Sequence, residues 1–225
     1  LAAIDKNILL IDLDPQGNLS TGIGITEKQR KISVYDLITK DISINNTVLD
    51  TKIPNLKIIP SNLNLSGIEF ELATDEERTN KLYNKINSLG PSFDFVLIDC
   101  PPSLGILTVN SLVASNSVLV PLQCEFYALE GLAQLLRTVE KIKENLNPNL
   151  FLEGVILTMF DSRNRLSEDV VNDAREHLGE KVFKTIIPRN VRLSEAPSHA
   201  LPAIIYDQNC IGSLAYIDLA KELIN

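Results

Sequence analysis

Two aspartates stand one residue apart at the end of an apolar run, in the stretch ILLIDLDPQGNLSTG that begins at Ile8. Asp12 closes the run, and Asp14 is followed by a proline, which biases Asp14 toward an extended backbone. Carboxylates at the end of a buried strand can organise the water shell of a metal ion or activate a water molecule. For this stretch taken alone, such a centre and a plain Asp-Pro turn both remain open.

A third aspartate, Asp99, ends the apolar run in FDFVLIDCPPSLG. An apolar strand that ends in Asp is the pattern of a Walker B element, whose carboxylate holds Mg²⁺ directly or through water. A strand-terminal Asp that caps the next helix has the same appearance. Because Asp14 and Asp99 follow two separate apolar runs, the pair favours a centre for a magnesium-bound nucleotide.

Arginines follow two later apolar runs. The stretch TMFDSRNRLSEDV carries Arg163, and the stretch TIIPRNVRLSEAPSHALP carries Arg189 and Arg192. Solvated surface loops would account for both stretches. Residues 157–199 nevertheless hold seven Lys/Arg and seven Asp/Glu, in a chain whose net charge is −8. This segment is therefore the part of the chain that repels a polyanion least.

Short apolar runs alternate with amphipathic stretches along all 225 residues. We expect strands at residues 8–13, 56–59, 93–99, 117–122, 154–159, 182–187 and 203–206, and helices over the apolar stripes at 129–142, 166–178 and 213–223. Several of the strand-like runs are apolar throughout, which is typical of strands buried on both faces. The pattern predicts a single α/β domain over residues 1–225, with a mostly parallel twisted sheet and helices on both faces.

The positions of the acidic and arginine motifs agree with such a sheet, because ligands bind at the carboxyl ends of parallel strands. No apolar run approaches the ~20 residues that cross a bilayer, so we expect no membrane association. The three cysteines are scattered and lack the spacing of metal ligands. Reduced thiols, and therefore a cytoplasmic protein, are the expectation.

Taken together, DLDPQGN, VLIDCPPSLG, LTMFDSR and IIPRNVRLSEAPSH resemble the ParA/Soj-type chromosome-partitioning ATPases, which belong to the deviant Walker P-loop class. The resemblance runs from about Ile8 to the last expected helix. It implies a P-loop NTPase-like fold with ATP and Mg²⁺ as cofactors. It also implies a nucleoid-associated homodimer that forms with ATP, binds DNA without sequence preference, and is stimulated by a ParB-type partner.

The resemblance also implies roles for the three aspartates. Asp14 would orient or activate the water that attacks ATP. Asp12 would support the switch region and the water shell of the metal. Asp99 would hold Mg²⁺ through water.

Further roles are implied for the two arginine motifs. The loop of Pro188, Arg189 and Asn190 would lie against the adenine, largely through backbone contacts. Arg163 and Arg192 match the arginines with which family members bind DNA.

One departure from the family pattern is large. The family begins with a strand, a glycine-rich loop that contains two lysines, and a helix, all before the DLDPQGN strand. This sequence contains no G-x-x-x-x-G-K-[ST]. We therefore expect the first strand, the P-loop and most of the first helix, roughly 25 residues, to be absent from this chain, and expect the chain alone to be unstable or inactive.

Three alternatives remain open. A MinD-like membrane ATPase would end in an amphipathic helix with a basic face, whereas the ending SLAYIDLAKELIN resembles a helix that packs in a core. An iron–sulfur relative would need cysteines that bridge two subunits, for which Cys100 and Cys124 are the available residues. A non-enzymatic remnant, or an adaptor that binds DNA or a partner without hydrolysis, would agree with the absent P-loop.

Overall fold

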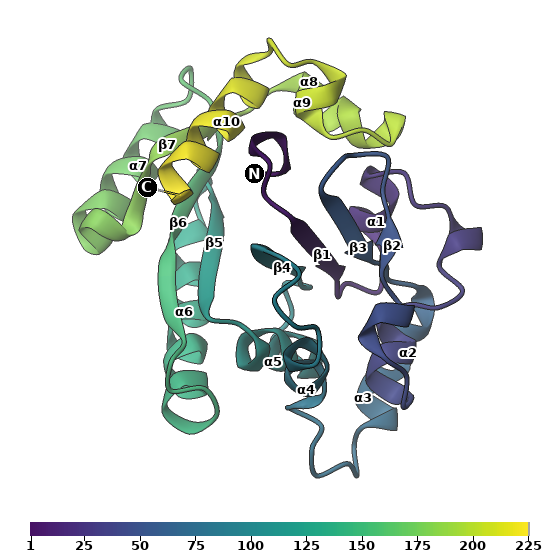
Figure 1. The fold of residues 1–225 in the computed structure, drawn as a ribbon. Coiled ribbons are helices and arrows are strands. Elements are labelled where there is room, and N and C mark those ends of the chain that lie inside the picture. The colour runs from purple at the N-terminus through teal and green to yellow at the C-terminus, as the bar shows by residue number, and fades with distance from the viewer. Residues whose placement is uncertain (225) are drawn as a thin grey trace. The chain divides into compact units, whose positions relative to one another are not determined.

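The computed structural model describes residues 1–224, which form two compact units, Leu1–Ser115 and the described residues from Asn116 onward (Figure 1). Each unit contains its own sheet and its own apolar core. The α/β fold with mostly parallel strands is therefore confirmed within each unit. A single domain over residues 1–225 stays a prediction.

The sheet of the first unit has four strands in the order β2-β3-β1-β4. Its strands β1, β3 and β4 run parallel, and only the short β2 is antiparallel to its neighbour β3. The elements of this unit are β1 (Ile8–Asp12), α1 (Asn18–Gly22), α2 (Val34–Thr39), β2 (Leu49–Asp50), β3 (Leu56–Ile59), α3 (Ile68–Glu71), α4 (Lys81–Asn87), β4 (Phe95–Asp99) and α5 (Ile106–Ala114).

Strand β1 is the centre of the first core because both of its faces are covered. Leu9 and Ile11 are fully buried in the same cluster as Leu37 of α2. Leu10 points to the opposite face and packs with Ile23, which follows α1. Successive side chains of a strand point to opposite faces, so a run that is apolar throughout requires this double covering.

The sheet of the second unit has three parallel strands in the order β5-β6-β7. The elements of this unit are β5 (Ser117–Gln123), α6 (Ala128–Asn145), β6 (Phe151–Phe160), α7 (Arg165–Leu178), β7 (Val182–Pro188), α8 (Val191–Glu195), α9 (Ala203–Tyr206) and α10 (Ile211–Ile224).

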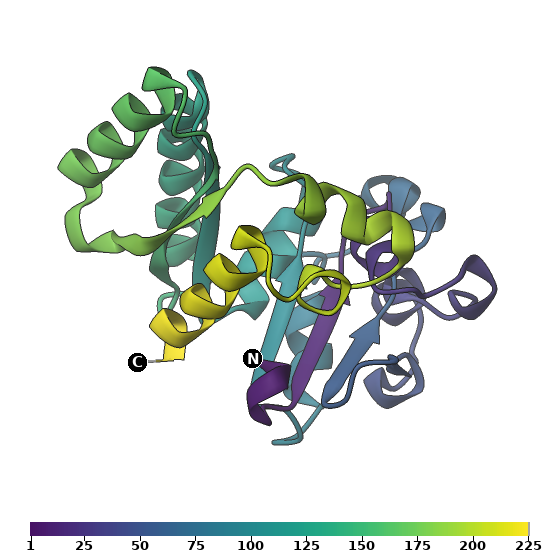
Figure 2. The ribbon, with the colours of Figure 1, turned by 90° about the horizontal axis from the view of Figure 1, so that it is seen from above.

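Helices cover both faces of this second sheet as well. Val155 and Leu157 of β6 belong to a cluster with Leu132 of α6. Ile156 points to the other face and packs with Leu219 of α10. Figures 1 and 2 show α6 and α7 on one side of the three strands and α10 on the other. Within the described part of the chain, no helix is both long and apolar enough to cross a membrane.

The structure corrects one predicted strand. Residues Ala203–Tyr206 form helix α9, in which the amides of Ile205 and Tyr206 donate to the carbonyl of Pro202. Four apolar residues bury equally well as a strand or as one turn of helix, so periodicity could not separate the two. Strand β2 was not predicted, because its two residues are too few to show any alternation.

Glu222 of α10 joins the last helix to the last strand. Its carboxylate accepts hydrogen bonds from the amide of Lys184 at 2.7 Å, and from the amide and hydroxyl of Thr185 at 3.0 and 2.7 Å. These amides lie where the register between β6 and β7 is irregular. Partial burial would raise the pKa of Glu222, but the hydrogen bonds outweigh it and hold the pKa below its usual value.

We expect Glu222→Gln to lower the free energy of unfolding by about 1 kcal/mol at pH 7, because Gln offers only one acceptor oxygen to three donors. A depressed pKa contributes stability above the unfolded value of 4.5, and this contribution is lost as pH falls through the folded pKa. Urea denaturation between pH 7 and pH 4 measures the difference. Glu140→Gln on the exposed side of α6 is the control, and an equal loss in both variants would contradict the prediction.

Candidate functional site

The three aspartates of the sequence analysis meet at one edge of the first sheet. Asp12 and Asp99 end the neighbouring strands β1 and β4 and are register partners. The chain continues from Asp12 into Leu13, whose amide donates to the carbonyl of Asp99 at 2.7 Å. Asp14 is the next residue and is half-buried. The structure thus brings Asp12, Asp14 and Asp99 to one edge of this sheet, and their roles at a magnesium centre stay predictions.

Asp12 is fully buried and acts as an acceptor for the start of α1. Its Oδ2 accepts hydrogen bonds from the amide of Ser20 at 2.8 Å and from the Ser20 hydroxyl at 2.6 Å. Its Oδ1 accepts from the amide of Asp14 at 3.3 Å. Burial raises the pKa of Asp12, although these hydrogen bonds act in the opposite direction. Asp12 therefore holds the backbone of Asp14 and of α1 in place through hydrogen bonds.

Asp14 leads into a tight turn. Its carbonyl accepts from the amide of Gly17 at 2.9 Å, and its Oδ1 accepts from the amide of Gln16 at 2.9 Å. Gly17 has φ +62°, a left-handed backbone that favours glycine. The turn places the Asp14 carboxylate beside the N-terminus of α1.

Asp99 lies in a strongly negative environment. Although its side chain reaches solvent, the surrounding protein removes enough water to raise the pKa of Asp99, and the charges of Asp12 and Asp14 raise it further. A cation bound here would relieve this repulsion.

Carboxylates are the ligands that Mg²⁺ prefers, and this ion usually keeps several waters and takes only one or two carboxylates from the protein. Within residues 1–224, no group of three or more His, Cys, Asp or Glu side chains forms a metal site by itself. The donor set thus fits an ion that shares its coordination with water and with a phosphate-bearing ligand.

The arginine motifs lie in the second unit, where two of the arginines line one cavity. The cavity has a volume of about 540 Å³ and is lined by Arg163, Arg189, Met159, Asp161 and Glu125, among others. The amide of Arg189 donates to the carbonyl of Phe160 at 2.8 Å, which ties the end of β7 to the end of β6.

Pro188 and Asn190 flank Arg189 in different ways. Pro188 is the last residue of β7 and pairs with Phe160. Asn190 begins α8, and its Oδ1 accepts from the amide of Arg192 at 2.9 Å. The predicted loop is therefore a strand end followed directly by a capped helix.

Both arginines expected to bind DNA are exposed, and both form ion pairs. Arg163 makes three hydrogen bonds to Asp161, from Nε at 2.9 Å, from Nη2 at 2.7 Å and from its backbone amide at 3.1 Å. These contacts hold the pKa of Asp161 far below its usual range. Arg192 pairs with Glu195 at 3.0 Å and with Asp207 at 3.5 Å. The pair of Arg192 with Glu195 is exposed on both sides and contributes little free energy, so a phosphate group could replace this carboxylate.

Sequence reasoning missed several residues of both sites. Ser20 bonds Asp12, and Glu125 pairs with Arg189 at 3.3 Å. Both are ordinary polar residues whose contacts depend on the folded chain. Met159 has φ +55°, a strained backbone for a residue with a side chain, and it lines the cavity of Arg163 and Arg189. No sequence signal identifies such a residue.

Comparison with known proteins agrees with this fold. A family model described as an AAA domain matches residues 1–152. A crystal structure from Mycobacterium smegmatis, described as cobyrinic acid a,c-diamide synthase with bound ADP and magnesium, is 33% identical with a TM-score of 0.86, over 99% of this chain and 83% of that one. The fold and the carboxylate edge thus define an α/β domain of the P-loop NTPase class.

Curated relatives narrow the class to a family. The chromosome partitioning protein ParA of Caulobacter vibrioides is 50% identical over 228 residues, which are 100% of this chain and 85% of that protein. The sporulation initiation inhibitor protein Soj of Bacillus subtilis is 47% identical, over 99% of this chain and 88% of that protein. The chain belongs to the ParA/Soj family of chromosome- and plasmid-partitioning ATPases.

We expect Asp99→Asn to raise the melting temperature at pH 7 by about 1–3 °C in the absence of magnesium, because the charge repelled by Asp12 and Asp14 is removed. A raised pKa means that ionised Asp99 costs stability. This cost is absent below the unfolded value of 3.8 and grows as pH rises through the folded pKa. The advantage of the variant should therefore shrink as pH falls toward 4.

The control for this measurement is Asp5→Asn, which removes an exposed carboxylate from the same unit. Added Mg²⁺ should raise the melting temperature of the wild type and of the control, and should leave Asp99→Asn unchanged. An equal response of all three proteins to Mg²⁺ would be evidence against a cation at Asp99.

Proposed function

We propose that this chain, together with a P-loop that its sequence does not contain, hydrolyses ATP with Mg²⁺ in the partitioning of chromosomal or plasmid DNA. The observation that carries the proposal is the meeting of Asp12, Asp14 and Asp99 at the ends of β1 and β4, in a chain 50% identical to a chromosome partitioning protein. Structures of similar fold with bound ADP and magnesium, or with an ATP analogue and magnesium, support the choice of cofactors.

Each aspartate has a role in this proposal. Asp99 holds the magnesium ion through water, and the ion supplies the positive charge that a triphosphate and the three carboxylates require. Asp14 orients or activates the attacking water and receives its proton. Asp12 is committed to Ser20 and Asp14 by hydrogen bonds, so its part is to support the loop and the water shell.

In the second unit, Pro188, Arg189 and Asn190 form the loop that contacts the adenine. Arg189 and the strained Met159 line the same cavity, and strained backbone concentrates at functional sites. The rigidity of the loop supports this role: Arg189 is bonded to the end of β6, and Asn190 caps α8.

The working form is a homodimer that assembles with ATP, lies on the nucleoid in the cytoplasm and meets a ParB-type partner that stimulates hydrolysis. Arg163 and Arg192 bind DNA phosphates in this form. The exposure of both arginine side chains supports this role, and the pair of Arg192 with Glu195 is exposed on both sides, so it contributes little free energy. Contacts to phosphate carry no sequence information, which agrees with DNA binding that has no sequence preference.

We expect Asp14→Ala to lower kcat for ATP by at least about a hundredfold, the usual contribution of a group that activates water. Binding of a non-hydrolysable ATP analogue should stay within about threefold of the wild type, since Asp14 acts on the water rather than on the nucleotide. Phosphate release and equilibrium binding measure the two quantities, and Asp5→Ala is the control.

Wild-type turnover in Asp14→Ala would refute the assignment of Asp14. A wild-type protein that binds DNA or a partner protein without any ATP turnover would instead favour an adaptor without hydrolysis.

We expect Arg192→Ala to weaken DNA binding equally on unrelated sequences and to reduce the slope of log affinity against log salt by about one for each phosphate that is no longer bound. Asp161→Asn should strengthen binding, because it frees Arg163 from its carboxylate partner. Fluorescence anisotropy with two unrelated duplexes at several salt concentrations measures both effects. The control is Arg137→Ala on α6. An equal loss of affinity in Arg137→Ala would mean that the change in net charge, and not a contact of Arg192 with phosphate, causes the effect.

A further inference from the structure

The side chain of Arg30 reaches back to both ends of the segment that carries α1. Its Nη1 donates to the carbonyl of Gly17 at 3.3 Å, and its Nη2 donates to the Thr21 hydroxyl at 2.9 Å. Its Nε and Nη2 both donate to the carbonyl of Ile25, at 3.1 and 2.6 Å. One guanidinium group thus closes the segment 17–25, and we call this set of contacts the Arg30 clamp.

The clamp acts on the turn that follows Asp14. Gly17 is the left-handed residue of that turn, and its amide donates to the carbonyl of Asp14 at 2.9 Å. Gly17 also lies close to the Arg30 side chain, since a Cβ on Gly17 would lie 2.6 Å from Nη1 of Arg30. A shift of Gly17 would therefore move the backbone from which the Asp14 carboxylate projects.

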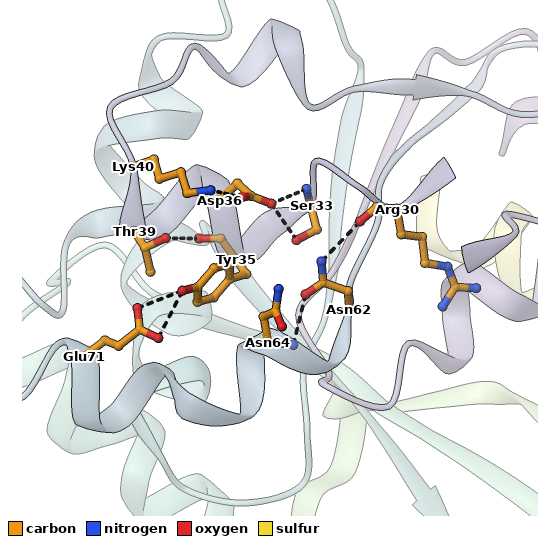
Figure 3. A network of polar contacts seen from close by, with 9 residues as sticks. All are labelled: Arg30, Ser33, Tyr35, Asp36, Thr39, Lys40, Asn62, Asn64 and Glu71. Atoms are coloured by element: carbon orange, nitrogen blue, oxygen red, sulfur yellow. Dashed lines mark hydrogen bonds and ion pairs between the residues drawn. The ribbon is translucent and has the colours of Figure 1, made fainter. Parts of the chain in front are cut away.

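The backbone of Arg30 is itself anchored to the end of β3. The side-chain amide of Asn62 donates to the carbonyl of Arg30 at 3.2 Å (Figure 3). Four residues on, the amide of Val34 donates to the carbonyl of Pro60 at 2.9 Å. Figure 3 also shows the capping box in which Ser33 and Asp36 begin α2. The backbone that carries Arg30 is thus held by hydrogen bonds to the segment that follows β3.

A second contact, from the segment that follows β3, supports the same segment. The amide of Ser61 donates to the Ser20 hydroxyl at 3.2 Å, and this hydroxyl donates in turn to Asp12. Asp12 therefore holds α1 from the strand side, and Arg30 holds it from the outer side. The positive charge of Arg30 also acts on Asp12, where it favours the ionised carboxylate.

We propose that Arg30 is a positioning residue for hydrolysis, which fixes the direction of the Asp14 carboxylate through the clamp on Gly17, Thr21 and Ile25. The proposal rests on the proposed ATPase function and adds to it a residue outside the four sequence motifs. Because the side-chain hydrogen bonds of Arg30 go to Gly17, Thr21 and Ile25, its loss should affect the rate of the chemical step more than the affinity for nucleotide.

The test compares Arg30→Ala, Arg30→Lys and Lys31→Ala in the complete protein. Lys31 is the exposed neighbour, so its variant removes the same charge without disturbing the clamp. Arg30→Ala should lower kcat for ATP by about tenfold, with KM within about twofold of the wild type, as expected when a catalytic group is slightly misplaced. Arg30→Lys should recover only part of the loss, since an ammonium group cannot reproduce the planar fork of the guanidinium.

Two further readouts separate positioning from simple loss of structure. Millimolar guanidinium should restore part of kcat in Arg30→Ala and leave Lys31→Ala unchanged. Amide hydrogen exchange at Thr21, Ile23 and Ile25, whose amides are bonded within this segment, should be at least about tenfold faster in Arg30→Ala than in Lys31→Ala.

The outcomes are distinguishable from those of the ATPase proposal. Faster exchange with an unchanged kcat, or exchange and kcat both equal to those of Lys31→Ala, would overturn the positioning role. If the wild type hydrolyses no ATP, the ATPase function fails, and the positioning role that rests on it is overturned with it. In that case, the exchange rates still decide whether Arg30 holds the segment.

Discussion

The first unit is organised around the repulsion between carboxylates at the ends of β1 and β4. The two strands are parallel and in register, so Asp12 and Asp99 end at the same edge of the sheet. Asp14 then adds a third negative charge. Like charges this close are costly in a partly dehydrated edge. Their surroundings must either satisfy each carboxylate with hydrogen bonds or leave it available to a cation.

The chain uses both solutions: hydrogen bonds satisfy Asp12, and Asp99 is left available to a cation. Asp12 is buried and satisfied by Ser20 and Asp14, so its part is structural support. Asp99 has a raised pKa, caused by burial and by its two acidic neighbours. Asp14 follows on a turn in which the amide of Gly17 donates to the Asp14 carbonyl and Arg30 donates to the Gly17 carbonyl. Helix α1 has five residues, and hydrogen bonds to Asp12 and from Arg30 hold it in position.

In the second unit, opposite charges are paired instead of being concentrated. Arg163, Arg189 and Arg192 each pair with a carboxylate within a short reach. The pairs of Arg189 and Arg192 are exposed on both sides and therefore contribute little free energy, whereas Arg163 holds the largely covered Asp161 with two hydrogen bonds from its guanidinium group. The three arginines of residues 157–199 are thus held in individual ion pairs, and two of their partners, Glu125 and Asp207, lie outside that range.

Much of the fold followed from local sequence. Six of the seven expected strands and the three expected long helices are present, because long runs of apolar residues can be buried only inside a sheet or along a helix face. The short run 203–206 was assigned wrongly, since four residues are too few to show a period. Placing Asp12, Asp14 and Asp99 at strand ends also needed only the sequence, as parallel strands bring their carboxyl ends to one edge.

The sequence by itself thus determined the strand and helix types, the acidic edge and the resemblance that the comparisons confirmed as family membership. Only the tertiary structure decided that Asp12 is satisfied by hydrogen bonds and that Asp99 has a raised pKa. Ser20 and Asp12 come into contact only when α1 has folded back on β1. It also decided that Arg30 reaches Gly17 and Ile25, and that Arg163 and Arg189 share a cavity. Hydrogen bonds and ion pairs of this kind depend on side-chain directions in three dimensions, which residue order and spacing do not specify.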